Sequence, residues 1–156
     1  MAALTADVHH PRRGNVKKIT VKAIGADTFF AGALVFADAS LGKAQVVPAS
    51  ADHFLGICVQ QVVATAADDL VEIYSEGEFA LAFAGAAEAD VGDAVVIDVS
   101  GTKTDNAEDI VSAADATVAA GDILVGRCVS LNEDQTSLGW IELHKGGGVA
   151  NLLGWL

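Results

Sequence analysis

The chain alternates short polar turns containing glycine with runs of apolar and β-branched residues. Three segments share one order, a small residue, then Gly, then several apolar residues; they are residues 31–36, 91–97 and 120–125. Gly adopts a positive φ freely, and Asp beside it can bond back to nearby backbone, so each segment predicts a tight turn leading into a strand. The β-branched runs suit a pleated, half-buried surface. The pattern predicts an all-β, mainly antiparallel fold, a compact β-barrel or sandwich-like domain.

Further strands are predicted where polar and apolar positions alternate or apolar residues run together. The predicted strands are residues 17–24, 29–36 with Gly32 as a bulge or turn, 45–47, 53–64 with a bend at Gly56, 70–74, 78–83, 94–99, 123–129 and 137–144. Residues 70–83 are expected to form a hairpin that turns at residues 75–77. We expect a loop or a single helical turn at residues 84–89, and a loop with one helical turn at residues 102–120.

The two ends of the chain differ from its middle. Residues 1–15 lack periodicity and are predicted to form an extended N-terminal arm, followed by one β-rich domain at residues 16–145. Residues 146–156 contain three consecutive glycines and then five large apolar residues. Soluble proteins seldom leave such a tail in water, so it is expected either to fold back on the core or to insert into a neighbouring subunit.

Charge is distributed unevenly along the sequence. The net charge is −12, yet residues 1–22 contain five of the nine Lys and Arg residues and one of the 21 Asp and Glu residues. An acidic body repels phosphate, so we expect no nucleic-acid partner. The basic stretch is predicted to contact an acidic partner surface or to be a solvated terminus. The apolar runs are too short for a spanning helix and the N-terminus lacks a secretory signal, so we expect no membrane segment and assembly in the cytoplasm.

Candidate chemistry is sparse in this sequence. Cys58 and Cys128 lie in strand-like runs and are interpreted as buried thiols, with a disulfide left open. The histidines lack the spacing of a zinc site, and neither a phosphate loop nor a nucleophile elbow is present. We therefore expect no catalytic residue, no bound metal and no cofactor, and a protein that is not an enzyme. A small carboxylate-based enzyme is kept as an alternative.

A set of short segments, taken in order, suggests a family. These segments are residues 30–35, 54–59, 69–73, 77–81, 91–95, 101–104, 123–128 and 140–143. In their order and spacing they resemble the capsid decoration (cement) proteins of tailed bacteriophages, over residues 16–144. The arm and the tail lie outside the resemblance.

The resemblance implies a structural role. It implies a β-rich homotrimer on the outer capsid surface of a virion, which binds the phage major capsid protein, bridges neighbouring subunits and stabilises the shell against internal DNA pressure. We hypothesise that the two atypical ends make the capsid or neighbour contacts, through Arg12, Arg13, Lys17, Lys18, Leu152, Leu153, Trp155 and Leu156. The alternative from another class is a host- or glycan-binding module on the virion surface.

Overall fold

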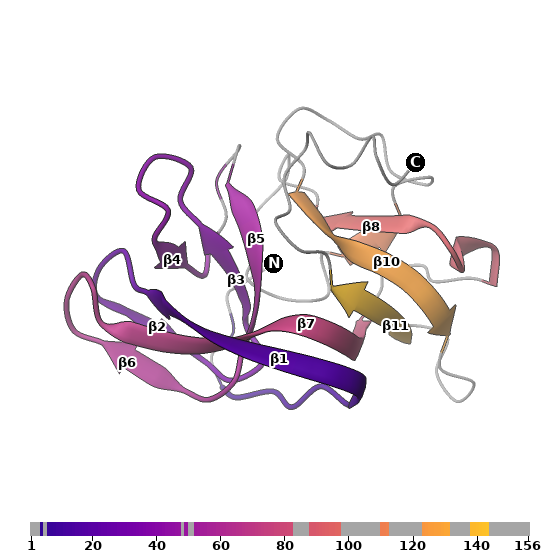
Figure 1. Ribbon diagram of the computed structural model, residues 1–156, viewed down its shortest axis with the longest axis horizontal. Helices are drawn as coiled ribbons and strands as arrows, with labels where there is room; N and C mark the ends of the chain where they lie inside the picture. The colour runs from indigo at the N-terminus through magenta and orange to yellow at the C-terminus, as the bar shows by residue number, and fades with distance from the viewer. Residues whose placement is uncertain are drawn as a thin grey trace.

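The computed structural model of the chain describes residues 4, 6–47, 49, 52–82, 88–97, 110–112, 123–131 and 138–143. The strands are β1 (Arg12–Lys22), β2 (Asp27–Phe29), β3 (Leu34–Ala37), β4 (Ala44–Gln45), β5 (His53–Cys58), β6 (Val62–Ala64), β7 (Leu70–Ala82), β8 (Ala94–Ile97), β9 (Ile110–Ser112), β10 (Ile123–Leu131) and β11 (Leu138–Leu143), with a short 3-10 helix η1 (Glu88–Asp90). Over these residues, nine strands form one curled sheet, and β2 pairs with β6 in a second sheet (Figure 1). The predicted all-β, mainly antiparallel fold is confirmed.

Strand β7 connects the two halves of the large sheet. The strand order is β4-β3-β5-β7-β11-β10-β8-β9, and β1 pairs with β7 outside this path. One edge of β7 is therefore covered by β1, while β5 and β11 share the other edge. The first lobe contains β1, β3, β4, β5 and the first half of β7; the second contains the rest of β7 and β8 to β11. A parallel bridge between Ala23 and Ala44 brings β4 back to the end of β1 and closes the first lobe into a ring of strands.

The two lobes repeat one arrangement of turn and strand. In the first lobe, the amide of Gly32 (φ 85°) donates to the carbonyl oxygen of Cys58 at 2.9 Å. In the second lobe, the amide of Gly92 (φ 98°) donates to the carbonyl oxygen of Cys128 at 2.7 Å. In both lobes the cysteine amide donates back, at 2.9 Å, to the residue that follows the glycine. Two of the three Gly-containing segments seen in the sequence thus begin the equivalent strands β3 and β8.

The repeat extends to the neighbouring strands. Gly56 and Gly126 precede the cysteines by two residues, and each faces the backbone of the next strand so closely that an added Cβ would lie 2.0 Å from a carbonyl oxygen. The equivalent pairs across the strands are Val35 with Gly56 and Val95 with Gly126, then Cys58 with Ile73 and Cys128 with Ile141. By the same scheme, the second half of β1 in the first lobe corresponds to the second half of β7 in the second. Each of these strands ends ten residues before its turn glycine.

Two apolar clusters fill the lobes, and β3 is buried on both faces between them. Leu34 and Phe36 belong to the larger cluster, whereas Val35 points into the smaller one. The larger cluster contains Leu34, Phe36, Phe54, Ile57, Tyr74, Phe79, Leu81, Val95, Ile97, Ile123, Val125, Cys128, Ile141 and Leu143. The smaller contains Ala23, Phe29, Ala33, Val35, Ala44, Val46, Cys58, Ala64, Val71 and Ile73. Burial of side chains on both faces fixes the register of the strands, because a one-residue slip would exchange the two faces.

The predicted hairpin at residues 70–83 is wrong, because β7 runs without reversal through the predicted turn. Gly77 has a φ of 131°, a conformation that favours glycine, and a Cβ there would lie 2.6 Å from Cγ1 of Val16. Strand β1 pairs with β7 on both sides of this point and adjusts its register twice between Arg13 and Lys18. A continuous partner along one edge therefore keeps β7 extended, and glycine serves here for close approach rather than for a turn.

Other predicted boundaries also shift. The strand expected at residues 53–64 divides into β5 and β6, which belong to different sheets, and the strand at 29–36 divides at the Gly32 turn. The register shift between β3 and β5 lies beside Gly56, where a bend was expected. Strand β9 lies within the predicted loop at 102–120, most of which is outside the described residues. The tail at residues 146–156 is also outside them.

Candidate interaction surface

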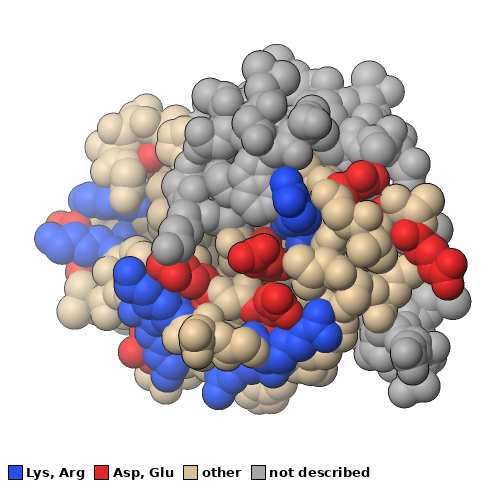
Figure 2. Space-filling view, turned by 45° about the vertical axis from the view of Figure 1, so that its right-hand side comes forward, with Lys and Arg blue, Asp and Glu red and all other residues tan. Residues whose placement is uncertain are grey.

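Five basic side chains follow strand β1, which lies exposed along the outer edge of β7. We call them the β1 cations; they are Arg12, Arg13, Lys17, Lys18 and Lys22. Four of them face carboxylates of β7 or of the residues just before it: the pairs are Arg13–Glu78, Lys17–Glu76 at 3.5 Å, Lys18–Glu72 at 3.9 Å and Lys22–Asp68 at 3.9 Å. Figure 2 shows basic side chains in rows along this face with acidic side chains between them. Exposed pairs of this kind contribute about 0–1 kcal/mol each, so the cations stay accessible to a competing carboxylate.

Arg13 makes the most extensive contacts of the β1 cations. Besides its ion pair with Glu78, its Nη2 donates to Oγ of Ser130 at 2.8 Å, and its guanidinium lies 4.3 Å from the centre of the Trp140 ring. The side chain thus connects β1 to β10 and β11. A planar guanidinium can stack and donate at once, which an ammonium group cannot.

Arg12 and Lys18 lie on either side of the bulge in β1 but share one aromatic ring. The Arg12 guanidinium is 4.9 Å from the centre of the Tyr74 ring and donates to its hydroxyl, and the Lys18 ammonium is 5.5 Å from the same centre. Tyr74 itself is buried in the larger apolar cluster. The ring therefore holds the charged groups of two cations by cation–π contact.

The segment predicted to form an extended N-terminal arm lies against the sheet, from residue 7 onward. The amide of Val8 donates to the carbonyl oxygen of Ala31 at 2.8 Å, and the amide of Ala31 donates to the Asp7 carboxylate at 2.9 Å. The amide of Ala80 donates to the carbonyl oxygen of Pro11 at 2.8 Å. Strand β1 then begins at Arg12 rather than at residue 17, so residues 12–15 belong to the sheet. Polar residues mask this strand in the sequence because an exposed edge strand need not alternate.

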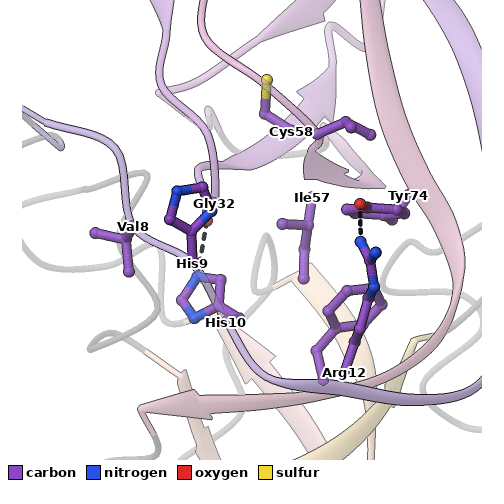
Figure 3. Close-up of a pocket in the computed structure, with 10 residues that line it drawn as sticks. Val8, His9, His10, Arg12, Gly32, Ile57, Cys58 and Tyr74 are labelled. Carbon is purple, nitrogen blue, oxygen red and sulfur yellow. Dashed lines mark hydrogen bonds between the residues drawn. The ribbon is translucent and has the colours of Figure 1, made fainter.

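A small cavity of about 50 Å³ lies beneath this segment (Figure 3). His10 and Arg12 reach over it from the segment, toward Gly32 and Tyr74 respectively, with Ile57 between them. Nε2 of His10 donates to the carbonyl oxygen of Gly32 at 2.9 Å in the tautomer that carries its proton there. Burial lowers the pKa of His10, against the opposing effect of its backbone hydrogen bonds. A cavity of this size has room for one or two water molecules. The contacts of His10 and Arg12 across it attach residues 7–12 to the sheet.

A larger hollow of about 330 Å³ opens where β1 bulges over Gly77. It is lined by Arg13, Gly14, Asn15, Glu76, Gly77, Glu78, Glu142 and Leu143. Over the part of the chain that the structure describes, no group of three or more His, Cys, Asp or Glu side chains is arranged to hold a metal ion. Ion pairs between β1 and β7 meet solvent in this hollow, through Arg13, Glu76 and Glu78.

The two cysteines are free and buried, which confirms their interpretation as small apolar side chains. Burial raises the pKa of each thiol to about 11. The Sγ of Cys58 donates to the carbonyl oxygen of Gln60 at 3.0 Å, and Cys128 makes the equivalent contact to Ser130 at 3.8 Å. Neither thiol is poised as a nucleophile, since reactivity requires the thiolate.

The structure brings together Arg12, Arg13, Lys17 and Lys18 on β1, although Arg12 and Arg13 were predicted to lie on the N-terminal arm and only Lys17 and Lys18 on a strand. The other proposed contact residues, Leu152, Leu153, Trp155 and Leu156, lie outside the described residues, and the proposed contacts of both groups stay predictions. Sequence reasoning missed Tyr74 and Trp140 as their aromatic partners. The sequence feature that could have predicted this surface is the set of acidic residues Glu72, Glu76 and Glu78. They can pair with the cations of one neighbouring strand only if residues 70–82 form a single continuous strand.

Comparison with known protein families and with curated proteins finds no match to this sequence. The resemblance to decoration proteins therefore stays a prediction, and the geometry defines only a class: an all-β protein of two repeated lobes that share one strand. In the described residues, no helix combines the length and apolar character needed to cross a membrane.

Proposed function

We propose that this protein is a capsid decoration subunit that binds the outer surface of a tailed-phage head and bridges neighbouring major capsid subunits. The observation that carries the proposal is the gathering of the β1 cations on one exposed strand of an otherwise acidic chain. The ion pairs of Lys17 and Lys18 with β7 are long and solvent-exposed, so carboxylates on a capsid surface can compete for these two cations. The sequence resemblance over residues 16–144 supplies the identity of that surface.

The scaffold behind the strand suits a mechanical role. Strands β3 and β8 and the first part of β10 are buried on both faces, so the β1 surface rests on two packed apolar clusters. A rigid, pre-ordered surface loses little conformational entropy on binding. In the proposed assembly, a homotrimer would place three such surfaces against adjacent capsid subunits, and avidity would strengthen weak single contacts.

The test uses decoration-free heads and the purified full-length protein. We expect cosedimentation with heads, increased resistance of those heads to heat and to low ionic strength, and a trimer by light scattering. Reversing two cations, Lys17→Glu with Lys18→Glu, should lower head occupancy at least tenfold. Lys17→Arg with Lys18→Arg, which keeps both positive charges, is the matched control and should retain occupancy.

Two outcomes would overturn the proposal. The first is unmodified protein that neither joins the heads nor makes them tougher. The second is binding to host cells or to glycans in the absence of capsids, with no affinity for heads, which would support the alternative of a host-binding module.

A further inference from the structure

The repeat of the two lobes exposes a difference at one strand edge. In the second lobe, the outer edge of β7 is occupied by the chain's own N-terminal segment: Arg12 lies opposite Phe79, Arg13 opposite Glu78, and Pro11 accepts a hydrogen bond from Ala80. This is strand addition within one molecule. In the repeat, Glu78, Phe79 and Ala80 of β7 correspond to the residues sixty positions earlier in the chain. These are Lys18, Ile19 and Thr20 of β1, in the first lobe.

The equivalent edge in the first lobe is occupied by β4 only at the end of β1, where the amide of Ile24 donates to the carbonyl oxygen of Ala44 at 2.9 Å, and over the described residues it is open at Lys18 and Thr20. Ala23 directs its amide and carbonyl toward Asp69 and Asp68, on the β7 side. Because backbone groups of a strand alternate in direction, Ile19 also faces β7, whereas Lys18 and Thr20 direct theirs outward. Both residues are exposed, and no described strand pairs with them on that side. Two amides and two carbonyls thus present a short template for another strand.

Charge determines what this edge can accept. Lys18 occupies the position in the first lobe that Glu78 occupies in the second. Glu78 forms an ion pair with Arg13 of the added segment. A second copy of the N-terminal segment would place an arginine opposite Lys18, which disfavours it. A carboxylate opposite Lys18 would instead gain an ion pair. The ammonium has three donors, and its present partner, Glu72, is 3.9 Å away and itself 42% exposed.

The faces of β1 define the rest of the pattern. The side chains of Lys18 and Thr20 lie on the solvent face, whereas Ile19 packs against the smaller apolar cluster. A strand added here would continue both faces of the sheet. It would carry acidic or polar residues opposite Lys18 and Thr20 and an apolar residue opposite Ile19.

We propose that the outer edge of β1 at Lys18–Thr20 is a strand-addition site for an extended segment of a partner protein in which acidic and apolar residues alternate. As the mode of contact with a capsid, the site rests on the proposed function. The edge itself is tested without capsids, so the two can fail separately.

The probe is a capped heptapeptide that alternates Glu and Val, titrated into isotope-labelled full-length protein. We expect amide shift changes concentrated at Lys18 and Thr20, and affinity at least tenfold higher than for the peptide in which Lys replaces Glu. Thr20→Pro removes one outward amide that β7 does not use, a position at which edge strands tolerate proline. It should lower affinity at least tenfold, whereas the matched variant Thr20→Val, which keeps the amide, should bind as the unmodified protein does.

A second variant keeps the test decisive if Thr20→Pro does not fold, as judged by circular dichroism. Lys18→Glu keeps the backbone and should reverse the preference from the Glu peptide to the Lys peptide. Equal binding of both peptides, shift changes centred elsewhere, or full affinity in a folded Thr20→Pro variant would each overturn the site. Heads that bind the protein while the peptide does not would overturn the site and leave the capsid role standing. Peptide binding without head binding would do the opposite.

Discussion

Cys58 and Cys128 occupy equivalent positions in the two lobes: the carbonyl oxygen of each accepts a hydrogen bond from the amide of a turn glycine with positive φ. Both thiols are buried, and both have a pKa raised by burial to about 11. The similarity of the two environments follows from the repeated arrangement of strands, since local sequence around the cysteines shares little beyond Gly-x-Cys-Val.

The two thiols are expected to react slowly and similarly in the folded protein. With a pKa of about 11, about one thiol in a thousand is ionised at pH 8, and burial limits access further. Labelling with a chromogenic disulfide reagent should be slow until denaturant is added, and then both sites should react. Rapid labelling of one site, or a mass two units low that indicates a disulfide, would contradict the buried pair of free thiols.

Gly56 and Gly126 should both be intolerant of a side chain. A Cβ at either position would lie 2.0 Å from a backbone carbonyl oxygen, which cannot move aside as a flexible side chain could. We expect Gly56→Ala and Gly126→Ala each to reduce the free energy of unfolding by about 2–4 kcal/mol, measured by denaturant titration. Gly25→Ala is the control, because nothing lies within 4 Å of its added Cβ. A large effect at one position only would argue against equivalent packing of the lobes.

Arg13 should matter more for stability than the other β1 cations. Its contacts with Glu78, Ser130 and Trp140 tie the edge strand to three others. Since the side chain is 44% exposed, solvent screening limits the loss on Arg13→Ala to about 1–2 kcal/mol. Lys22→Ala, which removes an exposed pair at 3.9 Å, should change the free energy of unfolding by less than about 0.5 kcal/mol. Equal effects of the two substitutions in denaturant titrations would show that the bridging contacts of Arg13 add nothing.

The docking of residues 7–11 should weaken in acid. Because the pKa of His10 is lowered in the folded protein, the folded state binds this proton less well than the unfolded chain does. The stabilisation by neutral His10 is complete above its ordinary pKa of 6.5 and decreases as the pH falls through that value. Between pH 7.5 and 5.5, proteolysis near the N-terminus should therefore become faster.

The variant His10→Gln keeps an amide donor for the Gly32 carbonyl but does not titrate. It should lose the acid sensitivity, while His9→Gln, the change at its exposed neighbour, should keep it. An unchanged pH profile in His10→Gln would assign the acid sensitivity to other groups.

The candidate surface was predictable only in part. The cluster of basic residues on β1 could be predicted from the sequence, because these residues lie close together in the chain and their charges can be counted directly. Their partners Glu72, Glu76 and Glu78 were hidden by the prediction of a hairpin, which would have divided β7 at Gly77. The single glycine was compatible with a turn or with close approach, and the choice depended on Val16 of another strand.

The sequence by itself determined the all-β class, the turns at Gly32 and Gly92 and the burial of both cysteines, because these depend on local backbone preference and on side-chain polarity. Only the tertiary structure decided that β7 runs straight, that β5 and β6 separate, and that two lobes share one strand. Those features depend on which strand edges pair with each other. Pairing joins residues that are far apart in the chain, as Arg12 and Phe79 are. It does so through backbone amide and carbonyl groups, which are the same in nearly every residue and therefore leave no mark in the sequence.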